Sequence, residues 1–350
     1  MGRRLGWFGG VTVAALLVAV SVPAGAAAGG YTQENLVSDQ PGVAQLTDPQ
    51  LVNAWGMSRG PNTPVWVSDN GADVTTLYNG AVPGNPESPV AKVLTVSIPG
   101  GAPTGQVFNN TSAFVLPGTT TPARFIFIGE HGDLSAWAGG AAATLISHTD
   151  GAIYKGLALA HSPSGPMLLA ANFHANRIDV FDGAFAQAPV TGMFTDPTLP
   201  AGYAPFNVAE IGGQVFVTYA KQDSDAEDDV AGPAHGFVDV YTTSGAFVKR
   251  FATHGVLNSP WGMTIAPANF GQFSSDLLIG NFGDGRIHAF DPNTGEVLGI
   301  VRGTSGAPLA IDGLWALMVG DAVAGGLNSI WFSAGPDDES HGLLGILRAR

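Results

Sequence analysis

The stretch Asn53-Ala54-Trp55-Gly56-Met57 recurs along this chain. It returns as Ser259-Pro260-Trp261-Gly262-Met263 and Gly313-Leu314-Trp315-Ala316-Leu317, and weaker copies begin at Thr111, Lys155 and Phe206. If these three positions are equivalent to Trp55, Trp261 and Trp315, the successive intervals are 56, 44, 51, 55 and 54 residues. A repeat of this length, filled with short strands and turns, is typical of a β-propeller.

Each repeat contains the same succession of strand-like segments. In the fifth repeat, residues 261–266 are followed by the apolar run 276–281 and the alternating segment 285–291. Alternation with β-branched and aromatic residues favours strands. We therefore expect residues 29–350 to form one all-β domain, a six-bladed β-propeller. Residues 31–38 also resemble a strand, and we expect them to complete the last blade and close the ring, which removes an exposed edge.

Residues 1–28 have the features of a secretory signal peptide. Arg3 and Arg4 precede an apolar run over residues 11–20 and a small-residue segment over 23–28. The run is too short for an ordinary membrane-spanning helix, and the paired arginines leave both the Sec and the twin-arginine export routes open. We expect a bacterial protein that is secreted or periplasmic, monomeric and without a membrane anchor. The chain has no cysteine, so no disulfide holds the fold.

Charge limits the classes of partner. The chain carries 28 acidic against 14 basic residues and a net charge of −14. Such a surface repels nucleic-acid phosphates and anionic membranes. It favours cations and neutral or positively charged ligands, so we expect a small-molecule or glycan ligand and no nucleic acid.

Several motifs along the chain carry a family resemblance, and they lie at residues 35–42, 67–71, 154–157, 203–208, 219–223 and 334–342. In these motifs the sequence resembles an uncharacterised family of exported bacterial β-propeller proteins. Some of its members carry a Pro-Glu-Pro-type sorting tail, which this sequence lacks. More distantly, the blades resemble the NHL-type repeat, whose propellers include lactonases, lyases and binding modules. The resemblance implies fold and export, and no particular activity.

In a propeller, the loop before each inner strand and the turn after each second strand open onto one face. Asp69, Glu130, Asn172 and Asn281 fall in those turns and offer the carboxylate and amide oxygens that Ca²⁺ prefers. They are therefore candidate metal ligands, with calcium as the candidate cofactor. The alternative is that Asp and Asn satisfy the backbone of their own turns. The acidic segment 223–229 is either a solvated loop or a loose calcium site.

The same turns supply candidate catalytic and ligand-binding residues. His131 and His174 are candidate general bases because histidine titrates near neutral pH, although each could instead be an ordinary rim residue. The candidate ligand-binding residues are Trp55, Asn70, Asn172, Trp261, Asp284 and Trp315. The tryptophans could alternatively wedge between blades.

Three functions remain open at this point. The first is a binding module for an extracellular or cell-envelope ligand, with or without calcium. The second is a metal-dependent hydrolase or lyase of lactonase type, acting at the same channel mouth. The third is a structural component of an extracellular matrix. The motifs of nucleophilic hydrolases, zincins and phosphate-binding loops are missing from the sequence, so the residue pattern favours binding.

Overall fold

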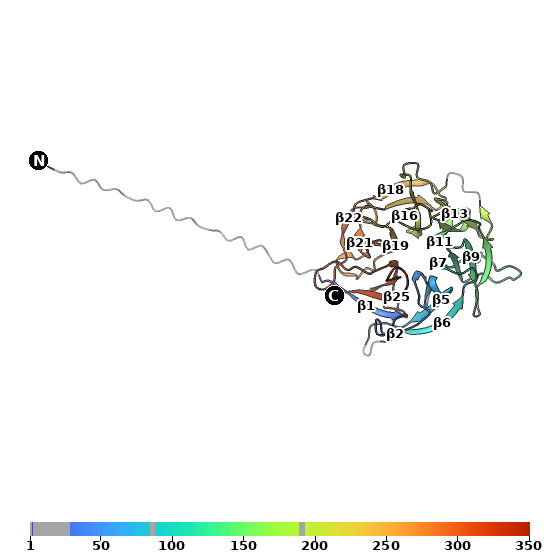
Figure 1. Cartoon of the computed structure of the whole chain (residues 1–350), viewed down its shortest axis with the longest axis horizontal. Coiled ribbons are helices and arrows are strands. Elements are labelled where there is room, and N and C mark those ends of the chain that lie inside the picture. The colour runs from blue at the N-terminus through green and yellow to red at the C-terminus, as the bar shows by residue number, and fades with distance from the viewer. Residues whose placement is uncertain (1, 3–28, 85–87, 189–192) are drawn as a thin grey trace.

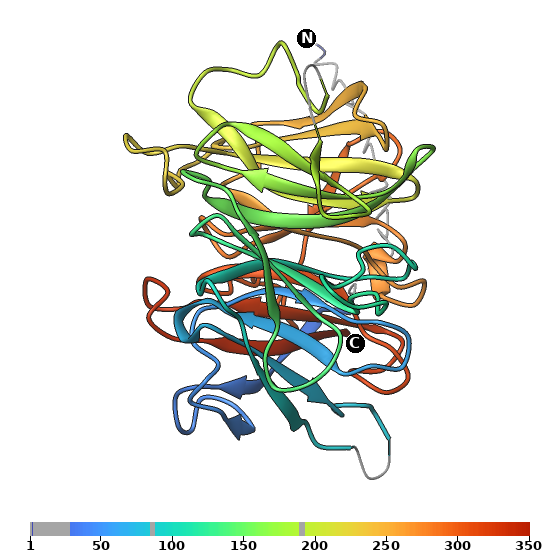
Figure 2. The same ribbon diagram turned by 90° about the vertical axis from the view of Figure 1, so that its right-hand side faces the viewer.

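The computed structural model describes residue 2 and residues 29–84, 88–188 and 193–350. The predicted signal peptide lies outside these residues. Six sheets stand radially around one axis, and the predicted six-bladed β-propeller is confirmed (Figure 1). Seen edge-on, the strands cross the thickness of a disc and the loops lie on its two faces (Figure 2). Among the described residues, no helix is long and apolar enough to cross a membrane.

Five blades are four-stranded antiparallel sheets whose strands follow one another in chain order from the axis to the rim. Their strands, blade by blade, are β3 (Ala54–Ser58), β4 (Val65–Asp69), β5 (Val74–Asn79), β6 (Ala91–Ser97); β7 (Pro103–Phe108), β8 (Phe125–Gly129), β9 (Asp133–Trp137), β10 (Thr144–His148); β11 (Tyr154–Ser162), β12 (Gly165–Asn172), β13 (Arg177–Asp182), β14 (Gln187–Ala188); β15 (Tyr203–Ile211), β16 (Gln214–Lys221), β17 (Phe237–Thr242), β18 (Phe247–Thr253); and β19 (Pro260–Ile265), β20 (Leu277–Asn281), β21 (Ile287–Phe290), β22 (Val297–Ile300). Two short 3₁₀ turns are η1 (Asn70–Ala72) and η2 (Gly271–Phe273).

The sixth blade joins the two ends of the domain. It contains β23 (Leu314–Val319), β24 (Ser329–Ala334), β25 (Leu343–Ala349), β1 (Tyr31–Ser38) and β2 (Leu46–Thr47). β1 pairs antiparallel with β25, from Tyr31 opposite Ala349 to Ser38 opposite Leu343. The expected closure of the ring by the N-terminal strand is therefore confirmed, and the outer edge of β25 is covered.

Apolar side chains fill the six gaps between neighbouring blades. Between blades 1 and 2, for example, Trp66 stacks on Phe125 with ring centroids 3.9 Å apart. One further cluster lies on the axis itself, and it contains Trp55, Trp261 and Trp315. The core is thus one layer per blade interface plus a central aromatic group.

The second blade corrects the repeat. Its inner strand is β7, so the residue equivalent to Trp55 is Thr104 and not Thr111. The corrected intervals are 49, 51, 51, 55 and 54 residues, which is a more regular period than the sequence suggested. Thr111 instead lies in the loop after β7, where its amide and hydroxyl both donate to Asn109.

Candidate functional site

Every inner strand carries an irregularity at the same place. The strand pairing slips between Ala54 and Met57 in blade 1, and an equivalent slip occurs in each other blade. A bulge of this kind adds a residue to one strand and re-aims its side chain. The six bulge residues, which we call the anchor ring, are Trp55, Thr104, Lys155, Phe206, Trp261 and Trp315.

A glycine or alanine follows five of the six anchors because the blades meet closely there. A Cβ on Gly56 would lie 2.3 Å from the carbonyl oxygen of Thr104, and one on Gly262 would lie 2.6 Å from that of Trp315. Neither distance leaves room for a side chain. The repeated glycine is therefore required where the backbones of neighbouring blades come close together at the channel wall.

The tryptophans of the anchor ring close the channel. Trp315 stacks on Trp55 with centroids 3.7 Å apart and meets Trp261 edge-on at 5.8 Å. Phe282 stacks on the same indole at 4.0 Å, and Phe206 lies 5.7 Å from it. We call this group, with Phe173, the aromatic plug. These tryptophans are buried where neighbouring blades meet at the axis, and they contact one another there.

A second ring of residues follows the second strand of each blade. In every blade, the backbone N–H of this residue donates to the carbonyl of the residue just before the inner strand. The six residues are Asn70, Glu130, Phe173, Gln222, Phe282 and Gly335. Phe173 and Phe282 belong to the aromatic plug, whereas Asn70 and Glu130 enter a polar network beside it.

Three of the four predicted metal ligands lie one residue earlier, and their side chains stay within the blades. Asn172 Nδ2 donates to Asp179 at 2.8 Å, and Asn281 Nδ2 donates to the carbonyl of Val256 at 2.8 Å. Asp69 is fully buried, and this burial raises the pKa of its carboxyl well above the usual range. The structure therefore does not bring Asp69, Asn172 and Asn281 together with Glu130. No group of three or more His, Cys, Asp or Glu side chains suited to a metal ion lies among the described residues.

The predicted general bases lie on the rim. His131 is exposed, with Nδ1 2.8 Å from the carbonyl oxygen of Gly100, and His174 is exposed, with Nδ1 3.3 Å from that of Ala226. Asp284 is also on the rim and accepts a hydrogen bond from Asn281 at 3.2 Å. None of these three lines the cavity described below.

Lys155 is the functional candidate that sequence reasoning missed. Its side chain is 3 % exposed, and Nζ lies 2.5 Å from Glu130 Oε1 and 3.0 Å from Asp228 Oδ1. The ammonium also sits 5.3 Å from the centre of the Trp55 ring, in cation–π range. Burial by itself lowers the pKa of Lys155, but Glu130 and Asp228 outweigh it and raise the pKa. Lys155 is therefore a buried cation at neutral pH.

Side-chain hydrogen bonds connect the plug to this cation. Trp315 Nε1 donates to Asn53 Oδ1 at 3.1 Å, and Asn53 Nδ2 donates to Glu339 at 2.6 Å and to Asn70 at 3.3 Å. Asn70 Nδ2 in turn donates to Glu130 Oε2 at 2.9 Å. Burial raises the pKa of Glu339 to about 7, with repulsion from Glu130 adding to the effect.

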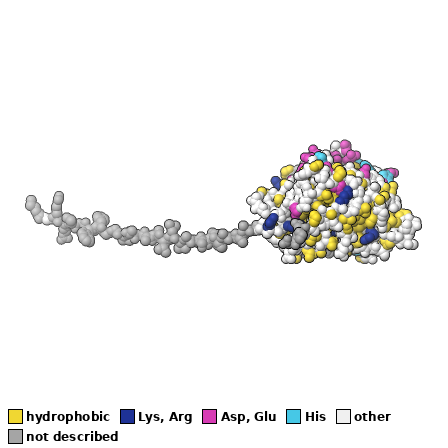
Figure 3. Space-filling model, turned by 90° about the horizontal axis from the view of Figure 1, so that it is seen from below, with side chains coloured by type: hydrophobic (Ala, Val, Ile, Leu, Met, Phe, Trp, Pro, Cys, Tyr) yellow, Lys and Arg dark blue, Asp and Glu magenta, His cyan; other side chains and the backbone are white. Residues whose placement is uncertain are grey.

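These groups border a cavity of about 360 Å³ at the channel mouth, which we call the mouth cavity. Its charged lining is Lys155, Asp228, Asp229, Asp312, Asp338 and Glu339, and Phe282 and Trp315 supply aromatic surface. Acidic side chains gather along one face of the disc (Figure 3). Burial raises the pKa of Asp229, whose Oδ2 is enclosed.

No family model matches the chain. The chain is 33 % identical to the uncharacterized protein R648 of Acanthamoeba polyphaga mimivirus, over 89 % of its own length and 78 % of that protein. It is 32 % identical to L690 of the same virus, over 89 % and 84 %. These relatives are viral and give no support to the bacterial origin expected from the sequence.

Two solved structures share the fold. A Bacteroides thetaiotaomicron protein of unknown function superposes with a TM-score of 0.55 and 13 % identity, over 90 % of this chain and 73 % of the other. Streptogramin B lyase superposes with a TM-score of 0.52 and 10 % identity, over 91 % and 97 %. At such identity the likeness concerns the fold alone. The two viral relatives are closer in sequence, and the chain belongs to the same protein family as mimivirus R648 and L690.

Proposed function

We propose that the protein is a binding module that takes a small organic cation in the mouth cavity. The observation that carries the proposal is the surplus of carboxylates around a lysine that is already paired. Glu130 and Asp228 neutralise the Lys155 ammonium. Asp229, Asp312, Asp338 and Glu339 remain on the same cavity wall.

Electrostatics favours a cationic ligand over a neutral or anionic one. Carboxylates that face one another across a small cavity repel, and an ammonium between them relieves that repulsion. Phe282, which is partly exposed and stacks on Trp315, adds an aromatic surface, and an aromatic ring attracts cations through its face. Pockets of roughly 300–1,000 Å³ hold small ligands, and the 360 Å³ of this cavity suits a monosaccharide-sized molecule. An amino sugar, free or within a glycan, has this size and charge.

The test compares two sugars that differ in one group. Isothermal titration calorimetry of the purified protein with glucosamine and with glucose isolates the contribution of the ammonium. We expect glucosamine to bind and glucose to bind at least about tenfold more weakly, which corresponds to about 1.4 kcal/mol. Equal affinities for the two sugars would contradict the proposal.

Two variants locate the binding site. Asp229→Asn removes a carboxylate of the cavity wall at nearly constant volume and should weaken glucosamine binding about tenfold. Asp150→Asn removes a fully exposed carboxylate that lies 3.2 Å from His148 Nε2, and it should leave binding unchanged. Titration with Ca²⁺ tests the calcium-dependent alternative. Competition between Ca²⁺ and glucosamine would show that the cavity binds the metal ion instead.

An acid–base enzyme is the second candidate, and Glu339 favours it. A carboxyl with a pKa of about 7 is suited to proton transfer at neutral pH, and here it shares a cavity with the Lys155 cation. We propose Glu339, rather than His131 or His174, as the general base of such a hydrolase or lyase. A lactone panel tests it: turnover that Glu339→Gln abolishes and His174→Ala retains would establish the enzyme.

We also propose that residues 1–28 direct export and that the protein works outside the cytoplasm. The motivation is the charged, apolar and small-residue succession of that segment. Mass spectrometry of protein recovered from the culture medium or periplasm of a bacterial host checks it. The expected product begins near residue 29, and full-length protein retained in the cytoplasm would exclude export.

A further inference from the structure

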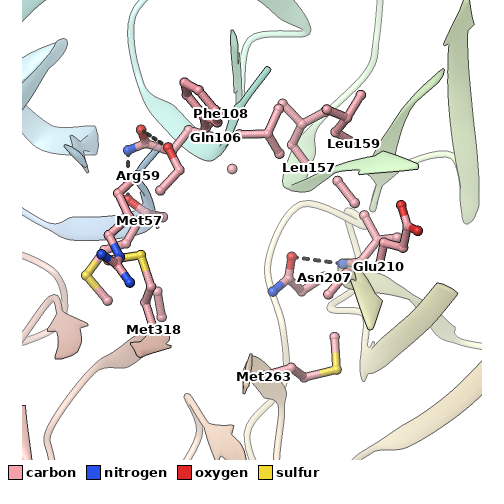
Figure 4. A pocket seen from close by; sticks show the side chains of 18 of the residues that line it. Met57, Arg59, Gln106, Phe108, Leu157, Leu159, Asn207, Glu210, Met263 and Met318 are labelled. Atoms are coloured by element: carbon pink, nitrogen blue, oxygen red, sulfur yellow. Dashed lines mark hydrogen bonds between the residues drawn. The ribbon is translucent and has the colours of Figure 1, made fainter. Parts of the chain in front are cut away.

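The opposite mouth of the channel holds a second pocket with different chemistry. Its volume is about 510 Å³, and inner strands of all six blades line it. Met57, Met263 and Met318 enter it from blades 1, 5 and 6, and Leu157, Leu159 and Phe108 complete much of the wall (Figure 4). We call it the methionine pocket.

Gln106, a polar side chain of the pocket wall, is already hydrogen-bonded within the protein. Gln106 accepts from Ser58 at 2.9 Å and donates to Gly56 at 2.9 Å and to Ser68 at 3.0 Å. Its amide is therefore committed to hydrogen bonds within the channel wall.

The two charges at the edge of the pocket are paired as well. Arg59 forms an ion pair with Asp321 and donates to the carbonyl of Gly320. Glu210 accepts from the backbone N–H of His161 at 2.9 Å and lies 2.9 Å from the ring Nδ1 of the same residue. Since both charges have partners, a charged ligand would gain little here to offset its loss of hydration.

Methionine makes the apolar wall adaptable. Three of the six methionines in the sequence line this pocket. An unbranched, polarisable side chain fits apolar ligands of different shape and favours contact with aromatic rings. Leucine or valine at the same positions would give a more rigid wall.

The aromatic plug separates the two pockets. Trp261 lines the methionine pocket, Trp315 lines the mouth cavity, and their ring centroids are 5.8 Å apart. The two mouths thus lie back to back across one aromatic layer, and one ligand cannot reach both.

We propose that the methionine pocket is a second binding site, which takes an uncharged, apolar small molecule with aromatic character. This site is independent of the mouth cavity and of the cationic ligand proposed there. Its size lies within the range of small-ligand pockets, roughly 300–1,000 Å³.

A pair of dyes tests the charge preference. N-phenyl-1-naphthylamine is neutral, and 1-anilinonaphthalene-8-sulfonate has nearly the same body with an added sulfonate. Fluorescence titration of the purified protein should show that the neutral dye binds at least about tenfold more tightly than the sulfonated dye. Equal affinities, or tighter binding of the sulfonate, would overturn the proposal.

The protein contains its own reference signals for the location of binding. With ¹³C-methyl methionine, the NMR signals of Met57, Met263 and Met318 should shift on addition of the neutral dye. Met167 and Met193 pack between blades 3 and 4 and should not shift. Single Met→Leu variants assign the signals. Dye bound at exposed outer strands would leave all five signals in place, and that result would refute the site.

Two variants complete the test. Ala209→Trp places a large side chain on the pocket wall and should weaken dye binding at least about tenfold. Asp229→Asn, on the other side of the plug, should leave dye binding unchanged. Loss of dye binding in Asp229→Asn, or full binding in a folded Ala209→Trp, would contradict two separate sites.

Discussion

Replacement of Trp315 tests whether the aromatic plug holds the ring together. This indole is 1 % exposed and lies between Trp55 at 3.7 Å and Phe282 at 4.0 Å. Truncation of a buried aromatic to alanine costs about 3–5 kcal/mol. The loss of its N–H also leaves Asn53 Oδ1 without that donor, which costs about 1 kcal/mol more. We expect Trp315→Ala to lower the free energy of unfolding by about 4–6 kcal/mol.

Trp315→Phe separates the two contributions. It keeps an aromatic ring in the stack and removes the N–H donor, so we expect a loss of about 1–3 kcal/mol. Urea denaturation followed by far-ultraviolet circular dichroism measures both variants without relying on the fluorescence of the replaced residue. Leu327→Ala, at a side chain 68 % exposed, should change stability by less than about 0.5 kcal/mol.

One outcome would refute this reasoning. If Trp315→Ala lost less than about 1 kcal/mol, the stacked rings would not be a structural element of the channel. Trp315 would then be better explained as a ligand platform, as one interpretation of the sequence allowed. A matched loss of glucosamine binding at unchanged stability would support that explanation.

Three further predictions concern the network and the ring. Burial raises the pKa of Glu339 from 4.5 to about 7, so the folded state binds its proton more tightly than the unfolded state does. Stability therefore falls as the pH rises through this range, by at most about 3.4 kcal/mol. Urea titrations across the range should show a flatter profile for Glu339→Gln. Lys155→Met leaves Glu130 without its cation and should lower the free energy of unfolding by about 1–3 kcal/mol in the same assay. The loss stays within this range because the Glu130 carboxylate still reaches solvent. An unchanged stability would mean that the Lys155 cation does not stabilise the fold. Gly56→Ala forces a Cβ against the carbonyl of Thr104 and should lower the thermal midpoint by several degrees, and an unchanged midpoint would contradict the close approach of blades 1 and 2.

The fold could be predicted because the propeller repeat is carried by residues that geometry demands. The glycine after Trp55 and Trp261 has no room for a side chain, so it is visible in the sequence wherever blades meet closely. The anchor of blade 2 was predicted at Thr111, although Thr104-Gly105 carries the same glycine as Trp55-Gly56. Thr104 holds its place by donating from its hydroxyl to the carbonyl of Tyr154 at 2.7 Å, a contact that no apolar pattern reports.

The site could be predicted as a region and not residue by residue. The turns after the second strands do lie at the mouth, but consecutive strand residues face opposite sides. Asp69 and Asn172 end their strands and turn into the blades, whereas Asn70 and Glu130 follow their strands and join the network at the mouth. The predicted residues Asp69 and Asn172 are therefore one position too early, whereas Asn70 and Glu130, which were also predicted, do lie at the mouth. Lys155 served only as a marker of the period, although the dipeptide Lys155-Gly156 matches Trp55-Gly56.

A departure from the repeat is the strongest pointer to function in this molecule. Six equivalent bulges offer the same backbone, and stability favours small or aromatic side chains there, yet blade 3 buries a lysine. A buried cation costs free energy unless acidic groups surround it. One carboxylate would suffice for that, but Glu130, Asp228, Asp229 and Glu339 come to the same mouth from three separate loops. The carboxylates beyond the first exceed what the lysine requires. The remaining carboxylates therefore support the proposed cationic ligand, whose positive charge would offset the negative charge that Lys155 leaves unpaired.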